Sequence, residues 1–386
     1  MKQLGVGIIG CGVISDIYMR NMPLFQGLRL VACADMRAES AQAKAATYSI
    51  EAMSVDALLA RQDIDLIVNL TVPNAHFAIS QAAISAGKHV FSEKPLCVTP
   101  QDSARLIAQA KAAKLTIGGA PDTFLGAGGR IARELVDSHA IGRIIAGSVF
   151  LMSRGPESWH PAPDFFYQPG GGPVLDMAPY YLAALVNLMG PIARVQARTT
   201  MGFTERIISA PGPRNGERIK VETPTTINAF VTSANGAEVS FNMSWDVWVH
   251  GHTPIELYGS EGSLKVPDPN FYDGLVQVTQ KAGDWQTHDS ATRLYGKPNF
   301  RSPAWPASRP DRANYRCVGI AEMASAIVRG TPHRSSADLA SHTLAVMYAM
   351  LESGASAGKG IDIAQGFTQP APLTEPEAAA LWRDNA

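Results

Sequence analysis

The chain has 386 residues, more than a single hydrophobic core normally serves, so we expect two domains. Hydrophobic residues make up 46% and charged residues 17%, a composition that excludes a disordered or fibrous protein. Lys and Arg total 33 against 34 Asp and Glu, so the chain lacks the positive field that attracts nucleic acid or an anionic membrane.

No apolar run reaches the length that spans a membrane, and the first one is too short for a signal peptide. We therefore expect a cytoplasmic protein with no nucleic-acid or membrane partner. The cysteines are scattered without a CxxC pair, so we interpret them as structural thiols. We expect no metal, because His250 and His252, the one close histidine pair, have no cysteine or paired carboxylates nearby.

The first third of the chain alternates short apolar runs with helical patterns. The first run, Leu4–Ile9, is followed by a glycine turn and a helical pattern that reaches Met22. Further strands are expected at 28–34, 64–70, 89–92 and 115–118, and helices at 37–47, 76–86 and 101–113. This alternation predicts a doubly wound parallel sheet, so residues 1–120 are expected to form an α/β Rossmann domain.

Beyond residue 120 strands and helices no longer alternate, and the expected elements follow an α+β pattern. We expect a helix at 128–137, a strand at 144–152 and a helix at 176–189, and two closing helices at 313–328 and 336–352. Between them, turn residues separate strands at 195–200, 225–232, 237–245, 254–258, 262–266 and 274–280. Short turns of this kind join antiparallel strands, so residues 121–386 are expected to form an α+β domain with a mainly antiparallel sheet.

The turn after the first strand carries a dinucleotide fingerprint. Gly10 permits a tight turn, Gly12 lets the backbone approach a pyrophosphate, and Ser15 is a small residue where the following helix packs closely. With Val13 and Ile14, these residues form a loop whose amides and helix end would face the phosphates.

Asp35 lies 25 residues after Gly10, at the end of the second expected strand. An acidic residue at this place hydrogen-bonds the ribose hydroxyls and repels a 2′-phosphate, so we expect NAD. Arg37 keeps NADP open as the less favoured cofactor, since a guanidinium there would hold the 2′-phosphate.

Four motifs together resemble one family. They are Gly-Ile-Ile-Gly-Cys-Gly at 7–12, Thr-Val-Pro-Asn-Ala-His at 71–76, Ser-Glu-Lys-Pro-Leu at 92–96 and Gly-Gly-Gly-Pro-Val-Leu-Asp at 170–176. The chain is similar at these places to the glucose-fructose oxidoreductase and inositol dehydrogenase family, also called Gfo/Idh/MocA. The resemblance extends to about residue 190 and is looser beyond.

The resemblance implies a fold and an assembly. A Rossmann domain would be followed by an α+β domain whose large open sheet packs against another subunit, giving a homodimer or homotetramer. It also implies that Thr71, Pro73, Asn74, His76 and Glu93 join the cofactor site.

The resemblance further implies that Lys94 lies beside the nicotinamide and that Asp176 and the residue four positions later face a sugar or polyol. That later residue is Tyr180, where many members carry histidine, so the carrier of the proton is open. In one scheme Tyr180 is the acid/base and the Lys94 ammonium stabilises its phenolate. In the other, Lys94 is the base and Tyr180 only binds the sugar.

Asp176 and Tyr180 are four residues apart near the start of an expected helix, so both project from one face. Each residue also has a purely structural interpretation. Asp176 would be the N-cap of the helix, Tyr180 a half-buried aromatic and Lys94 a solvated surface lysine.

Weaker candidates lie outside these motifs. In the loop at 157–161, Trp159 would stack on a sugar ring and His160 would hydrogen-bond a hydroxyl, or the loop is simply packed. Period-two alternation places Asp246, Trp248 and His250 on one strand face, which we interpret as an oligomer interface rather than a pocket wall. Arginines at 154, 206, 301, 309, 312 and 316 leave room for an acidic sugar, because a guanidinium pairs with a carboxylate or sulfonate, but most of the set is interpreted as surface charge.

The leading interpretation is an NAD-dependent oxidoreductase that transfers hydride between the nicotinamide and a secondary hydroxyl of a sugar, glycoside or cyclitol. The alternative is an NAD-dependent glycoside hydrolase that oxidises the ring, eliminates the substituent and reduces the ring again. A silent NAD sensor is disfavoured, because a sensor has no need of Lys94, Asp176 and Tyr180 together.

Overall fold

The structure is a computed structural model that describes residues 3–281, 283–302, 305, 307–364 and 366–383. The chain divides into two compact units. The first unit comprises residues 1–125, 314–344 and 373–386, and the second comprises 126–313 and 345–372. Two late segments that we expected within the second domain thus belong to the first unit.

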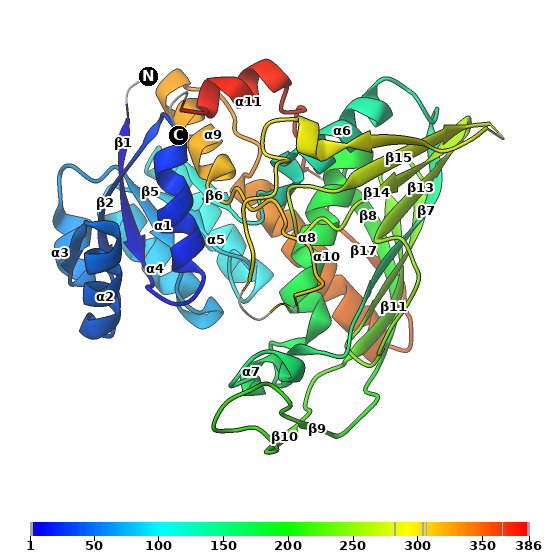
Figure 1. Ribbon diagram of the computed structural model, residues 1–386, viewed down its shortest axis with the longest axis horizontal. Coiled ribbons are helices and arrows are strands. Elements are labelled where there is room, and N and C mark those ends of the chain that lie inside the picture. Colours follow the sequence, from blue (N-terminus) through cyan, green and yellow to red (C-terminus); the bar gives the residue numbers. More distant parts are fainter. Residues whose placement is uncertain (1–2, 282, 303–304, 306, 365, 384–386) are drawn as a thin grey trace. The chain divides into compact units, whose positions relative to one another are not determined.

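The first unit is built on a parallel sheet with the strand order β3-β2-β1-β4-β5-β6 (Figure 1). Its strands are β1 (Leu4–Ile9), β2 (Leu28–Ala34), β3 (Glu51–Met53), β4 (Leu66–Asn69), β5 (His89–Ser92) and β6 (Ile117–Gly119). All residues of β1 are buried, as an inner strand covered on both faces requires. The expected Rossmann sheet is therefore confirmed.

The helices of the first unit come from both ends of the chain. They are α1 (Ser15–Asn21), α2 (Ala38–Tyr48), α3 (Val55–Ala60), α4 (Pro73–Ser85), α5 (Pro100–Ala112), α9 (Val318–Arg329), the first half of α10 (Ala337–Ala355) and α11 (Glu375–Leu381). Arg334 joins the late segments, because it pairs with Glu322 of α9 and Glu377 of α11, each at 2.9 Å. The amide of Asn21 also donates to the carbonyl of Asn314 at 2.8 Å, which fixes this segment to α1.

Two histidines, the buried His342 and the partly buried His333, give the first unit a pH-dependent stability. Burial lowers the pKa of His333 and of His342 to about 4, from an ordinary value of 6.5. Since the unfolded chain binds these protons more readily, the stabilisation is complete above about pH 6.5 and is lost as the pH falls toward 4. At pH 5 each histidine should lower the free energy of unfolding by about 2 kcal/mol relative to pH 7.5.

We expect His342→Gln to remove about 2 kcal/mol of this pH dependence, measured by urea unfolding at pH 7.5 and pH 5. The matched control is His139→Gln, which replaces a histidine in an exposed turn by the same residue. An equal pH dependence in the wild type and the His342 variant would contradict the assignment.

The second unit is built on a nine-stranded sheet with the order β16-β15-β14-β13-β7-β12-β11-β8-β17. The strands are β7 (Ile144–Met152), β8 (Ile192–Thr200), β11 (Thr226–Ser233), β12 (Glu238–Ser244), β13 (Ile255–Gly259), β14 (Gly262–Val266), β15 (Leu275–Gln280), β16 (Gln286–Asp289) and β17 (Ile361–Asp362). Only the β7–β12 pair is parallel among these described strands, so the expected large, mainly antiparallel sheet is confirmed.

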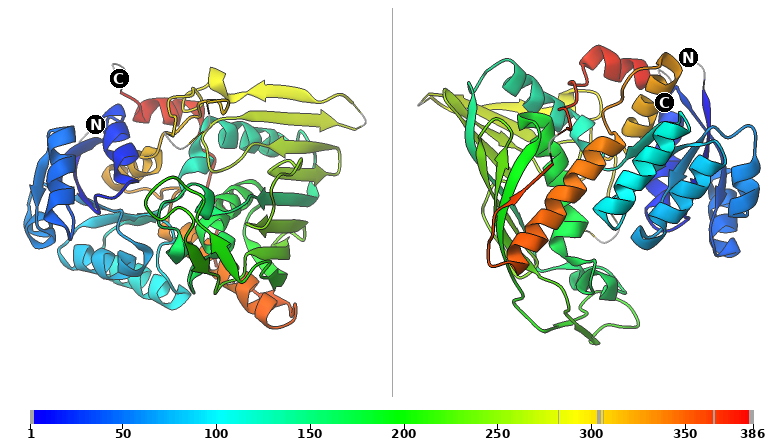
Figure 2. Two further views of the ribbon diagram at one scale, coloured as in Figure 1. Left: turned by 60° about the horizontal axis from the view of Figure 1, so that its bottom comes forward. Right: turned by 180° about the vertical axis from the view of Figure 1, so that it is seen from behind.

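Helices cover one face of this sheet (Figure 2). They are α6 (Ala127–Asp137), α8 (Gly172–Met189) and the second half of α10 (Ala337–Ala355). On the other face, side chains that alternate with the buried ones are exposed, such as Phe230 of β11 at 53%. The large sheet therefore has one open face.

A small lobe is attached to the second unit, and we call it the β9–β10 lobe. It comprises residues 154–170, which include α7 (Asp164–Tyr167), and residues 201–225, which include the paired strands β9 (Glu205–Ile207) and β10 (Arg218–Lys220). Figure 1 shows α7, β9 and β10 side by side. The lobe shares a small separate core with Trp245, the residue after β12; the lobe's members of this core are Tyr167, Ile208, Ala210, Ile219 and Val221. We did not expect α7, β9 or β10 from the sequence.

No helix among the described residues combines the length and apolar character needed to cross a bilayer. The cysteines Cys11, Cys33, Cys97 and Cys317 are buried and form no disulfide, as we expected of structural thiols.

Candidate functional site

The cofactor residues that we expected lie at one edge of the Rossmann sheet. Strands β2, β1, β4 and β5 are neighbours, and Ala34 pairs with Ile9, Ile9 with Asn69, and Asn69 with Ser92. These four strands therefore end at one level. The loops that follow them carry Asp35, the 10–15 turn, the 71–76 segment and Lys94, at the edge where doubly wound sheets bind nucleotides.

The glycines of the 10–15 turn have different tasks. Gly10 has φ of 103°, and a Cβ there would lie 2.5 Å from the carbonyl carbon of Leu70, so no other residue fits. A Cβ on Gly12 would meet no atom within 4 Å, which leaves its backbone open to a ligand. Val13 is 93% exposed, whereas Ser15 is buried and donates from Oγ to the carbonyl of Gly12 at 2.7 Å.

Alanine substitutions should separate the two tasks. Gly10→Ala should destabilise the protein by about 2 kcal/mol or more, because of the left-handed backbone and the clash with Leu70. Gly12→Ala should keep the wild-type stability but weaken NAD binding about tenfold or more, because its methyl group would occupy open space where a phosphate would approach. Thermal unfolding and NAD titration of both variants test this, and equal effects on stability would contradict it.

Asp35 links the end of β2 to the glycine turn. Its carboxylate accepts hydrogen bonds from the amides of Cys11 at 2.7 Å and Arg37 at 2.8 Å. A carboxylate has about four acceptor positions, so Asp35 retains the capacity to bind ribose hydroxyls. The side chain of Arg37 is exposed at the same edge.

The 71–76 segment leads from β4 into α4. Pro73 is the first residue of the helix and Asn74 is exposed, while Thr71 Oγ1 donates to Asn69 Oδ1 at 2.7 Å. His76 is only 1% exposed. Its Nδ1 lies 2.6 Å from the carbonyl oxygen of Pro95 and its Nε2 lies 3.0 Å from that of Thr71, so the ring joins two cofactor loops.

Glu93 is also enclosed rather than exposed. The hydroxyl of Tyr18 donates to its Oε1 at 2.7 Å, and the backbone amide of Lys94 donates to its Oε2 at 2.9 Å. Burial and this carboxylate raise the pKa of Tyr18, so the phenol remains a proton donor. Glu93 thus fixes the backbone at Lys94, whose side chain is half-buried.

Asp176 and Tyr180 lie within α8 in the second unit. The helix begins at Gly172, four residues before the expected start, so Asp176 is not an N-cap. The two residues occupy consecutive turns on one helix face, with Asp176 half-buried and Tyr180 6% exposed.

The β9–β10 lobe carries the weaker candidates, Trp159 and His160, on its surface, where Trp159 is 52% exposed. The lobe also corrects two expectations. Arg206 is not a surface charge, because its side chain is 1% exposed and pairs with Glu157 at 3.0 Å and with Asp246. Asp246 does not share a strand face with Trp248, because β12 ends at Ser244.

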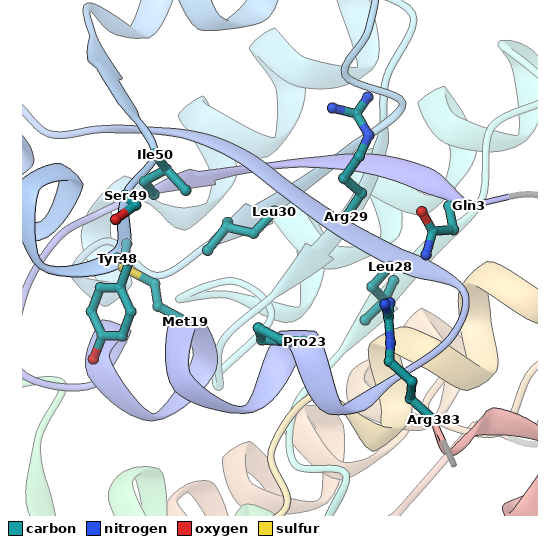
Figure 3. Close-up of a pocket in the computed structure, with 10 residues that line it drawn as sticks. All are labelled: Gln3, Met19, Pro23, Leu28, Arg29, Leu30, Tyr48, Ser49, Ile50 and Arg383. Atoms are coloured by element: carbon teal, nitrogen blue, oxygen red, sulfur yellow. The ribbon is translucent and has the colours of Figure 1, made fainter. Parts of the chain in front are cut away.

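A cavity of about 310 Å³ in the first unit is distinct from these loops (Figure 3). It is lined by Gln3, Met19, Pro23, Leu28, Arg29, Leu30, Tyr48, Ser49, Ile50 and Arg383. Gln3 precedes β1 and Leu28 begins β2, so the cavity lies toward the amino ends of the strands. The dinucleotide loops follow the carboxyl ends, at the opposite edge of the sheet.

Comparisons with known proteins agree with this geometry. Residues 4–118 match the family described as an oxidoreductase family with an NAD-binding Rossmann fold, and residues 130–265 match the GFO/IDH/MocA C-terminal domain. The chain is 27% identical over 339 residues to dTDP-3,4-didehydro-2,6-dideoxy-alpha-D-glucose 3-reductase of Streptomyces violaceoruber, covering 85% of this chain and 84% of the relative. It is 25% identical over 266 residues to inositol 2-dehydrogenase of Rhizobium meliloti, covering 67% and 74%.

Among solved structures, levoglucosan dehydrogenase in complex with NADH and L-sorbose has the same fold. Its TM-score is 0.78 at 22% identity, and the match covers 95% of this chain and 100% of that one. The first unit is thus an NAD-binding Rossmann domain, and the chain belongs to the Gfo/Idh/MocA family of oxidoreductases.

Proposed function

We propose that this oxidoreductase transfers hydride between NAD and a secondary hydroxyl of a sugar, glycoside or cyclitol. The observation that carries the proposal is the alignment of strand ends, which brings Lys94 to the same sheet edge as the glycine turn and Asp35. The substrate class is supported by the relatives, one of which is a reductase of a sugar nucleotide and another an inositol dehydrogenase.

Bound NAD would supply the hydride acceptor, and the chain's own side chains would handle the proton and the alcohol. We propose that Lys94 and Tyr180 serve one substrate hydroxyl and that Asp176 accepts a hydrogen bond from a neighbouring hydroxyl. Trp159 and His160 would contact the part of the substrate away from the reacting hydroxyl. His76 and Glu93 would act as positioning residues, because their side chains hold the backbone around Lys94.

The test records two products at once. The protein is incubated with NAD and a panel of sugars, cyclitols and aryl glycosides, and both NADH and released phenol are measured. We expect net NADH in a stoichiometric amount with the oxidised sugar. Phenol released without net NADH would identify the redox glycosidase instead, and neither product from any compound would contradict both.

We also propose that the open face of the nine-stranded sheet joins two copies of this chain. It holds the exposed Phe230 and a shallow cavity of about 360 Å³ beside Arg198 and Asn242, surfaces that a second copy would cover. Light scattering should give a mass of two or four times 41.2 kDa, and Phe230→Arg should lower it. A monomeric wild type would contradict the proposal.

A further inference from the structure

Three side chains of the β9–β10 lobe form one continuous aromatic surface, which we call the aromatic patch: Trp159, His160 and Phe165. The His160 ring lies between the others, with its centroid 5.5 Å from Trp159 and 5.4 Å from Phe165. Trp159 is 52% exposed and Phe165 is 53% exposed. Large aromatic rings bury much apolar area when a ligand covers them, so the exposed faces of Trp159 and Phe165 are available to bind one.

The patch also offers polar hydrogens. The amide of Ala162 donates to Nδ1 of His160 at 3.1 Å, so the neutral imidazole carries its hydrogen on Nε2. Burial lowers the pKa of His160 by more than the hydrogen bond with Ala162 and the nearby carboxylates raise it. The net lowering favours the neutral ring. With the indole N–H of Trp159, the patch combines apolar faces with two donors, a chemistry that suits a second ring of a glycoside.

Buried contacts hold the loop that carries the patch. Glu157 precedes Trp159 by two residues and accepts hydrogen bonds from Arg206, at 3.0 Å, and from Tyr167. Its backbone carbonyl accepts from the amides of Ser209 and Ala210, each at 2.9 Å. A surface held in this way needs little ordering when a ligand binds.

The patch lies beside the start of α8. A Cβ on Gly171 would clash with the carbonyl oxygens of Phe165 and Phe166, so α7 and the first turn of α8 are in close contact. Asp176 follows within the first turns of α8, and its carboxylate is close enough to the imidazole of His160 to raise the pKa of that ring. The patch therefore lies within electrostatic range of the carboxylate to which we assign a substrate hydroxyl.

We propose that the aromatic patch binds a second ring of the substrate, so that the enzyme prefers glycosides with a ring substituent to the free monosaccharides. This inference rests on the proposed function, because it places the second ring next to a first ring held at Asp176. It adds Phe165 as a specificity-determining residue that no sequence motif indicates.

The test uses the whole enzyme with NAD, and the probes are D-glucose, D-galactose, D-mannose and D-xylose with their phenyl glycosides. The measured quantity is the ratio of kcat/KM for each phenyl glycoside to that for its parent sugar. We expect a wild-type ratio of about ten or more for the oxidised sugar, and about a tenfold lower ratio in Trp159→Ala and Phe165→Ala, mainly through KM.

The matched control is Trp285→Ala. Trp285 is 37% exposed, and the ammonium of Lys265 lies over its ring. It precedes β16, which lies at the other edge of the sheet from β8, the strand that leads into the β9–β10 lobe. The ratio should therefore not change in this variant. Oxidation of sugars and phenyl glycosides at equal rates, or equal losses for both in the patch variants, would overturn the subsite and leave the proposed function intact. A lower mass of the patch variants in solution would also overturn it, by assigning the patch to a subunit contact. No NADH from any of these probes or from the wider panel of sugars and cyclitols would overturn the proposed function itself.

Discussion

Lys94→Ala should lower kcat by about a hundredfold or more while NAD binds with unchanged affinity. Lys94 follows β5, at the edge of the sheet where the glycine turn also lies. Its backbone amide, rather than its amine, donates to Glu93. We therefore expect loss of the amine to remove the proposed chemistry while the contact of Glu93 with the backbone stays in place. Steady-state kinetics and NAD titration measure the two effects, and Lys111→Ala, at an exposed lysine of α5, is the control that should retain full activity.

Substitution by arginine distinguishes the two schemes for the proton. Arginine keeps the positive charge but does not give up its proton at neutral pH. If Tyr180 is the acid/base, Lys94→Arg should retain measurable activity and Tyr180→Phe should lower kcat about a hundredfold. If Lys94 is the base, Lys94→Arg should be as inactive as Lys94→Ala, and Tyr180→Phe should mainly raise KM. Full activity in Lys94→Ala would remove the residue from the mechanism.

Arg206→Met should lower the free energy of unfolding by about 3–5 kcal/mol. Arg206 joins Glu157 and Asp246, whose side chains are 4% and 14% exposed, so its removal leaves two carboxylates buried without their partner. Urea unfolding measures the global loss, and amide hydrogen exchange in β9 and β10 shows whether the lobe opens first.

The matched control is Arg194→Met. Arg194 also pairs with an aspartate, Asp362, but their side chains are 46% and 78% exposed. Water screens such a pair, so the expected loss is below about 1 kcal/mol. A similar small loss in both variants would show that the buried ion pairs do not hold the lobe.

Much of the fold follows from local sequence patterns. The strands at 28–34, 89–92, 144–152 and 262–266 have the bounds that we expected, because apolar residues end at turn-forming neighbours. Strand β3 was missed, since its three residues are largely exposed at the sheet edge and show no apolar run. The glycine turn could be predicted from the sequence, because the local backbone conformation and the local space determine which residue types fit there.

Features that depend on contacts between residues far apart in the sequence could not be predicted from local patterns. No local pattern assigns α9 and α11 to the first unit, because that assignment depends on Asn21 and Arg334 meeting groups far along the chain. The burial of Arg206 was missed for the same reason, since β9 is short and both carboxylate partners are about 40 or more residues away. The enclosed position of His76 likewise depends on Pro95, from the next loop.

The central proposal is that the amine of Lys94 and the phenol of Tyr180 serve one reacting carbon. A crystal structure of the enzyme with NAD and an oxidisable sugar tests it most directly. Both Lys94 Nζ and Tyr180 Oη should lie within about 3.5 Å of the sugar hydroxyl nearest the nicotinamide C4. A structure in which either atom lies about 8 Å or more from that hydroxyl, with no water between them, would contradict the claim.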